Sequence, residues 1–152
     1  MRVVFVAPYA LPMSIGGFQT QVYQVFKELK ALGVDVSWHN FVDSNLEGVD
    51  ILQVMSTDTS MLSMIRRARN KGVKIVLTPM QGSRARSNLY LKGCLALSNI
   101  PKVCSTDRMN YEVIQSADYL TPLCSFEAKR MSNVYGFDEN RISVIPNGLD
   151  LS

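Results

Sequence analysis

The chain has 152 residues, of which 47% are hydrophobic and 19% are charged, and its formal net charge is +3. This composition is ordinary for a soluble globular domain, and no apolar run approaches the roughly 18 residues that span a bilayer. The first apolar run is broken at Pro8, too early for a signal peptide. We therefore expect one cytoplasmic domain over residues 1–152, with a substantial core.

Residues 2–33 have the pattern of a strand, a glycine turn and a helix. Residues 2–7 form a short apolar run, typical of a strand buried on both faces of a parallel sheet. From Phe18 the period changes, and Gly33 stands where a left-handed cap would end a helix. The apolar residues at helical spacing are Val22, Val25, Phe26, Leu29 and Leu32.

The glycine pair Gly16-Gly17 precedes this helix and is a candidate phosphate site. Backbone N–H groups at a helix N-terminus attract anions, and a residue without a Cβ lets a phosphate approach the backbone closely. Alternatively, the two glycines merely allow the loop to turn. The G-x-G-x-x-G pattern of dinucleotide oxidoreductases is not present after the strand, so that class is disfavoured.

The remainder alternates between strand and helix patterns. Asp58 or Thr57 is expected to cap the second helix, which ends at Gly72, and Ser125 to cap the last one, which ends at Gly136. Residues 89–97 favour a short helix, or else a loop that contacts a membrane or an acceptor. A further helix is expected from Thr106 or Asp107 to about residue 116. The other expected strands are 34–41, 50–55, 73–78, 117–122 and 141–145. This order predicts an α/β fold with a doubly wound, mostly parallel sheet.

The charges are segregated along the chain. Residues 59–102 contain nine basic residues and no acidic one, which suggests a surface for an anionic substrate, lipid headgroup or nucleic acid. Residues 66–71 end a helix at the edge opposite the glycine pair, which favours a solvated face, with contact to anionic lipid as the alternative. Nucleic acid is disfavoured because the basic residues are divided between opposite ends of the sheet.

The loop after the fourth strand is the second candidate site. It carries Gln81, Arg84 and Arg86 to the edge where ligands of open parallel sheets bind. Guanidinium groups there suit phosphate or carboxylate groups, although surface arginines without a ligand are an equal alternative. Gln81 offers hydrogen bonds but no acid or base at neutral pH.

The three cysteines, Cys94, Cys104 and Cys124, are odd in number and have no C-x-x-C spacing. They predict reduced thiols and neither a disulfide framework nor a zinc site. We expect no metal and no cofactor.

The end of the chain resembles a known family. Residues 117–120, Ser125, Tyr135-Gly136 and the stretch Val144-Ile145-Pro146-Asn147-Gly148-Leu149-Asp150 are similar to the close of the N-terminal domain of group 1 (family 4-type) glycosyltransferases. These are retaining, sugar-nucleotide-dependent enzymes of the GT-B fold. The opening strand, loop, glycine pair and helix resemble the start of the same domain, so the resemblance covers the whole chain.

The resemblance implies a Rossmann-like half of a two-domain transferase. Gly16 and Gly17 would lie beneath the donor diphosphate. Residues 146–152, with Asn147 and Gly148, would form the hinge to a donor-binding domain that is not in this chain, so the fragment alone is expected to be inactive. The acceptor, a glycan, a small molecule or a lipid-linked sugar, would lie against Tyr9, Gln81, Arg84, Arg86 and Ser125.

One position departs from the family. Many members carry a histidine after the fourth or fifth strand, whereas this loop reads Thr78-Pro79-Met80-Gln81-Gly82. The single histidine, His39, ends the second strand and is interpreted as structural. No catalytic side chain is therefore assigned. A non-catalytic binding or scaffold module of the same fold is the alternative function.

Overall fold

Five parallel strands form one sheet in the order β2-β1-β3-β4-β5. The computed structural model describes residues 1–8, 11–13, 16–40, 45–80, 87–98 and 105–147. Every neighbouring pair of strands is parallel. The strands are β1 (Arg2–Val6), β2 (Asp35–Trp38), β3 (Ile51–Met55), β4 (Lys74–Thr78) and β5 (Tyr119–Leu120). The predicted α/β fold with a parallel sheet is confirmed.

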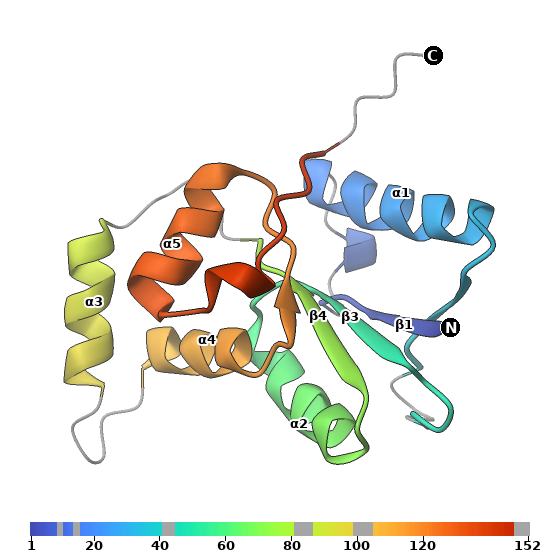
Figure 1. Cartoon of the computed structure of the whole chain (residues 1–152), viewed down its shortest axis with the longest axis horizontal. Helices are drawn as coiled ribbons and strands as arrows, with labels where there is room; N and C mark the ends of the chain where they lie inside the picture. The colour runs from blue at the N-terminus through green and yellow to red at the C-terminus, as the bar shows by residue number, and fades with distance from the viewer. Residues whose placement is uncertain (9–10, 14–15, 41–44, 81–86, 99–104, 148–152) are drawn as a thin grey trace.

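Helices cover both faces of this sheet, as Figure 1 shows. None of the helices in the described part of the chain is long and apolar enough to cross a membrane. The helix expected over residues 89–97 is present as α3, so the alternative of a loop there is wrong. The helices are α1 (Gly17–Ala31), α2 (Leu62–Asn70), α3 (Asn88–Leu97), α4 (Thr106–Gln115) and α5 (Ser125–Tyr135).

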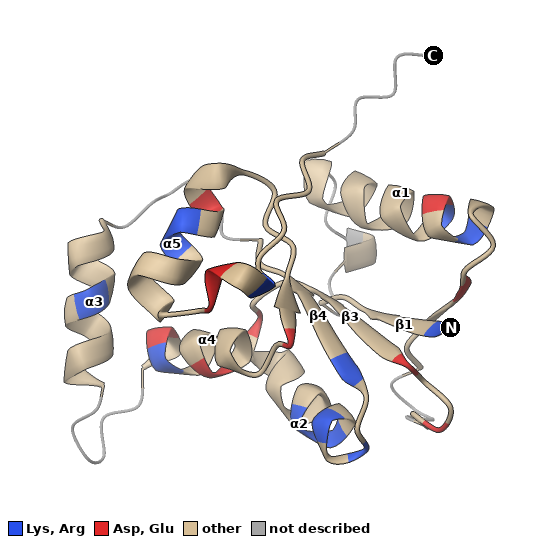
Figure 2. Ribbon diagram, in the orientation of Figure 1, with Lys and Arg blue, Asp and Glu red and all other residues tan. Residues whose placement is uncertain are grey.

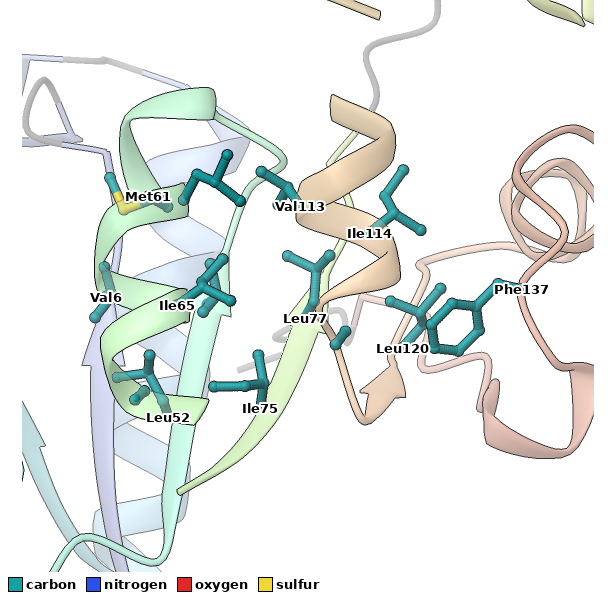
Figure 3. Packing of buried hydrophobic residues seen from close by; sticks show 14 of the residues in the cluster. Val6, Leu52, Met61, Ile65, Ile75, Leu77, Val113, Ile114, Leu120 and Phe137 are labelled. Atoms are coloured by element: carbon teal, nitrogen blue, oxygen red, sulfur yellow. The ribbon is translucent and has the colours of Figure 1, made fainter. Parts of the chain in front are cut away.

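The larger core lies on the face covered by α2, α4 and α5. Alternate residues of β1, β3 and β4 point to this side, for example Leu52 of β3 and Leu77 of β4. Ile65 of α2 and Ile114 of α4 pack against them and are fully buried, as Figure 3 shows. α3 joins this cluster at its edge through Leu91.

The smaller core lies on the opposite face, where α1 is the one α-helix of the described chain that contributes, joined by Leu11 of the short 3-10 helix Leu11–Met13. Phe5 of β1 is fully buried there and meets Phe26 of α1 edge-on, with ring centroids 5.5 Å apart. Because consecutive residues of β1 alternate between the two cores, β1 is buried on both faces, as its continuous apolar run predicts.

Beyond α1, the same face of the sheet carries a polar ladder. Thr78 Oγ1 lies 3.0 Å from Gln53 Nε2, which donates to it, and 2.7 Å from Thr121 Oγ1. Gln53, Thr78 and Thr121 belong to or follow β3, β4 and β5, so the ladder crosses three neighbouring strands. Their hydrogen bonds satisfy polar groups at positions where an apolar residue would need a covering helix.

Two sequence expectations are corrected. The sixth strand predicted over residues 141–145 does not form. Only a single parallel bridge joins Ile142 to Leu120. Ser143 and Ile145 donate backbone hydrogen bonds to Leu120 and Pro122, at 3.0 and 2.9 Å. Pro122 has no N–H to return to a ladder, so the pairing stops there.

The second correction concerns the start of α5. Ser125 is the first helical residue, and the cap position belongs to Cys124, whose side chain makes no capping hydrogen bond. The carboxylate of Glu127 instead accepts a hydrogen bond from the backbone N–H of Leu123, at 3.0 Å. Asp58 caps the 3-10 turn Thr59–Met61 that leads into α2, accepting from the N–H of Ser60 at 2.8 Å. The N-cap of α2 itself is Met61, whose side chain makes no capping hydrogen bond, so the cap predicted for the second helix lies one turn ahead of it.

Candidate functional site

The strand order puts a topological switch point at the carboxyl ends of β1 and β3. These strands are neighbours, but the helix that follows β1 packs on one face of the sheet and the helix that follows β3 packs on the other. Where successive connections diverge in this way, the space above the strand ends is open to a ligand. Figure 1 shows α1 starting at the edge where β1, β3 and β4 end.

The glycine pair forms the N-terminus of α1 at this edge. Gly16 is the N-cap, and its φ of 156° lies in a region that an L side chain rarely adopts. The first hydrogen bond of the helix runs from Thr20 N to Gly16 O at 3.2 Å. The N–H groups of Gly17, Phe18 and Gln19 therefore precede the intrahelical ladder and point out of the helix end.

This helix end is open to an anion. A Cβ built on Gly16 or Gly17 would meet nothing within 4 Å. No side chain caps the helix, and its first turn contains no acidic residue. α3 and α4, in contrast, are capped by the hydroxyls of Ser87 and Ser105, each of which accepts a backbone N–H. The positive end of the α1 dipole is thus left without a counter-group from these sources.

The segment directly after β3, at the same switch point, has an unusual backbone. Ser56 has a φ of 143°, and among the described residues it alone has a positive φ without being glycine. Its hydroxyl accepts a hydrogen bond from the N–H of Asp58 at 3.1 Å, which holds the turn. Strained residues of this kind gather at functional sites. Sequence reasoning missed Ser56, because a serine between a strand and a helix cap carries no signal of a positive φ.

A pocket of about 310 Å³ lies beside α1, at the carboxyl ends of β1 and β2. Its described lining comes from the end of β1, from the loop that leads to the glycine pair, from α1 and from β2. The lining residues include Ala7, Pro8, Leu11, Pro12, Tyr23 and Trp38. Sequence reasoning did not single out this pocket, because its walls are far apart in the chain.

His39 borders the same pocket. Burial and the positive charge of Arg67 lower the pKa of its imidazole from the usual 6.5. The ring is therefore neutral at pH 7. This agrees with the interpretation of His39 as a structural residue, and it adds no charge to the pocket.

Several predicted site residues lie outside the described part of the chain: Tyr9, Gln81, Arg84, Arg86 and Gly148. Ser125 is exposed at the first position of α5, and Asn147 is exposed in the segment after the bridge to β5. Neither is among the described residues that line the pocket. The roles of these residues in acceptor binding and in the hinge stay predictions.

The basic residues of α2 lie mainly toward its C-terminal end, away from the carboxyl edge of the sheet, as Figure 2 shows. Arg66 forms a salt bridge with Glu112 of α4 at 2.8 Å, and Lys74 of β4 forms one with Asp118 at 3.3 Å. These pairs support the interpretation of this region as a solvated charged face. Within the described ranges, no three His, Cys, Asp or Glu residues gather closely enough to hold a metal ion.

No protein-family model matches the chain, and no curated protein matches it significantly.

Proposed function

We propose that this chain is the N-terminal, acceptor-side domain of a retaining glycosyltransferase of the GT-B type. The enzyme would transfer a sugar from a nucleotide-sugar to a glycan, a small molecule or a lipid-linked acceptor. The observation that carries the proposal is the open, glycine-rich N-terminus of α1 at the β1/β3 switch point of the sheet. The order of sequence motifs from Gly16 to Asn147 adds to it.

In this proposal the N-terminus of α1 binds the diphosphate of the donor. The bond between the sugar and its diphosphate oxygen breaks, and negative charge grows on the departing diphosphate. The N–H groups of Gly17, Phe18 and Gln19, together with the helix dipole, stabilise that charge. The acceptor hydroxyl bonds to the same carbon on the same face of the sugar, and its proton leaves with the diphosphate.

The remaining parts of the proposal follow from the same assignment. A second, donor-binding domain supplies most contacts to the nucleotide, so the isolated 152-residue chain does not turn over. The enzyme works in the cytoplasm, where nucleotide-sugars are made, and contacts the inner face of the membrane if its acceptor is lipid-linked. In this proposal no metal is required, and the backbone amides and the helix dipole stabilise the charge of the diphosphate.

The test is sugar transfer by the protein that includes the proposed second domain, assayed with a panel of nucleotide-sugars. Gly17→Val fills the space above the helix end. Because the φ of Gly17 is not positive and its Cβ would meet no atom, the fold tolerates the change. We expect transfer to fall about 100-fold, the usual loss when an anion-stabilising contact is removed.

The matched control is Gly93→Val in α3, where a Cβ also meets open space. This variant should keep its activity. The proposal would be refuted if the Gly17→Val variant transferred sugar at the wild-type rate, or if no donor in the panel supported transfer. The second outcome would favour a non-catalytic module of the same fold.

A further inference from the structure

The pocket between β1, β2 and α1 has the chemistry of a site for an apolar group. Its described lining contains no Asp, Glu, Lys or Arg. Two prolines, a leucine and an alanine supply aliphatic surface, and Phe5 contributes a fully buried ring. A volume of about 310 Å³ falls within the range of small-molecule sites. Such walls favour an alkyl or prenyl chain over a phosphate or a sugar ring.

Aromatic stacking fixes one wall of this pocket. The indole of Trp38 stacks on Phe26 with ring centroids 4.5 Å apart and an interplanar angle of 14°. Tyr23 and Phe5 meet the indole edge-on at 5.6 and 5.8 Å. Three rings therefore hold Trp38 in one orientation, and a ligand would meet a wall that is already ordered.

Two aromatic residues at the rim of the pocket leave apolar ring surface exposed to solvent, which is unfavourable. The side chains of Tyr23 and Trp38 are 44% and 39% exposed. Although each packs against other rings, each keeps a large apolar surface in contact with solvent beside the cavity. An apolar ligand that entered here would cover both surfaces at once.

The pocket is also joined to the candidate diphosphate site. Leu11 and Pro12 line it, and they belong to the same connection between β1 and α1 as Gly16 and Gly17. Gln19 Nε2 donates to the carbonyl of Pro12 at 3.4 Å, which ties this loop to the first turn of α1. A molecule held in the pocket would thus contact the same β1–α1 connection that ends in the glycine pair.

From these observations we propose that the pocket holds the apolar aglycone of the acceptor, an alkyl or prenyl chain attached to the sugar that is extended. The identification of the ligand as an acceptor rests on the proposed function, whereas the preference for an apolar chain rests on the pocket alone. The neutral state of His39 agrees with an uncharged ligand.

The test uses Trp38, the single tryptophan of the chain, as the reporter. Methyl, butyl and hexyl β-glucosides are titrated into the 152-residue chain below micelle-forming concentrations, and the tryptophan emission is followed. Affinity should rise about fourfold with each methylene that enters the pocket. Equal affinity for the three glucosides would overturn the proposal.

Two variants separate the pocket from the rest of the surface. Tyr23→Ala removes part of the wall and should weaken hexyl glucoside at least tenfold, whereas Tyr23→Phe, which keeps the ring, should bind normally. Tyr119→Ala is the matched control, since Tyr119 is 52% exposed on β5 and does not line the pocket. Loss of binding in Tyr119→Ala equal to that in Tyr23→Ala would count against this site.

Further titrations identify which kind of molecule supplies the alkyl or prenyl chain. A response to hexyl glucoside but not to phosphatidylcholine vesicles indicates a free glycoside, and responses to both indicate a lipid-linked acceptor at a bilayer. A response to vesicles alone, or displacement of hexyl glucoside by uridine diphosphate, overturns the proposal. If glucoside affinity depends on alkyl-chain length but no sugar transfer is detected, the apolar pocket is supported and the proposed function is refuted. If sugar transfer is detected but affinity does not depend on alkyl-chain length, the proposed function is supported and the apolar pocket is refuted.

Discussion

Replacing Thr78 with valine should destabilise the protein although valine has nearly the same shape. Thr78 is 5% exposed, and its hydroxyl joins Gln53 at 3.0 Å and Thr121 at 2.7 Å. Each hydrogen bond contributes about 1 kcal/mol net, and its loss leaves a partly buried group without that partner. We expect the free energy of unfolding to fall by about 2 kcal/mol.

Urea denaturation followed by the emission of Trp38 measures this change. With a slope of about 2 kcal/mol per molar urea, the midpoint should fall by about 1 M. Thr121→Val and the double variant complete a mutant cycle, in which the two changes should be non-additive by about 0.5–1 kcal/mol, since they share one hydrogen bond. Thr106→Val, on an exposed helix start, is the control and should change stability by less than about 0.5 kcal/mol.

Additive effects in the cycle would refute the reasoning, as would a Thr78→Val variant as stable as the wild type. Either result would mean that the ladder does not stabilise the face of the sheet beyond α1. That face would then need a different explanation for its polar residues.

Three other changes test the fold and the pocket rim. Ile65→Ala, fully buried between α2 and the sheet, should cost about 2–5 kcal/mol in the same denaturation assay, and a cost under about 1 kcal/mol would contradict its place in the core. Gly136→Ala, at a φ of 66° after α5, should cost about 1–2 kcal/mol, and a neutral result would show that the helix does not end in a left-handed residue. His39 has a lowered pKa, so the unfolded chain binds more protons than the folded chain between that pKa and 6.5. Its contribution to stability is complete above about pH 6.5 and is lost as pH falls through the lowered pKa. The His39→Gln variant should therefore show a smaller fall in melting temperature over this pH range than the wild type. The same fall in both proteins would contradict the prediction.

The regular elements were predictable because their apolar patterns are strong and glycines punctuate them. The run at residues 2–7 alternates between the two cores, the run at 73–78 buries Val73, Ile75 and Leu77 in the larger one, and Gly33 and Gly136 end helices at φ of 80° and 66°. The last strand was not predictable from its apolar run alone. Whether it forms depends on Pro122, which follows the neighbouring strand β5, and pairing across a sheet is not visible in local sequence.

The site was predictable only in part for a similar reason. Gly16 and Gly17 are local signals, since they stand directly before a helical period. The pocket depends on Tyr23 of α1 meeting Trp38 of β2, and a tryptophan in a strand pattern indicates burial as readily as a binding wall. The positive φ of Ser56 is set by its surroundings and has no counterpart in its residue type.

The central claim is that the N-terminus of α1 binds the donor diphosphate. The most direct measurement is a titration of the ¹⁵N-labelled chain with uridine diphosphate, followed by the amide resonances. The account predicts that the amides of Gly17, Phe18 and Gln19 shift most and that Gly17→Val abolishes these shifts while Gly93→Val preserves them. Shifts confined to other residues, or equal shifts in wild type and Gly17→Val, would contradict it.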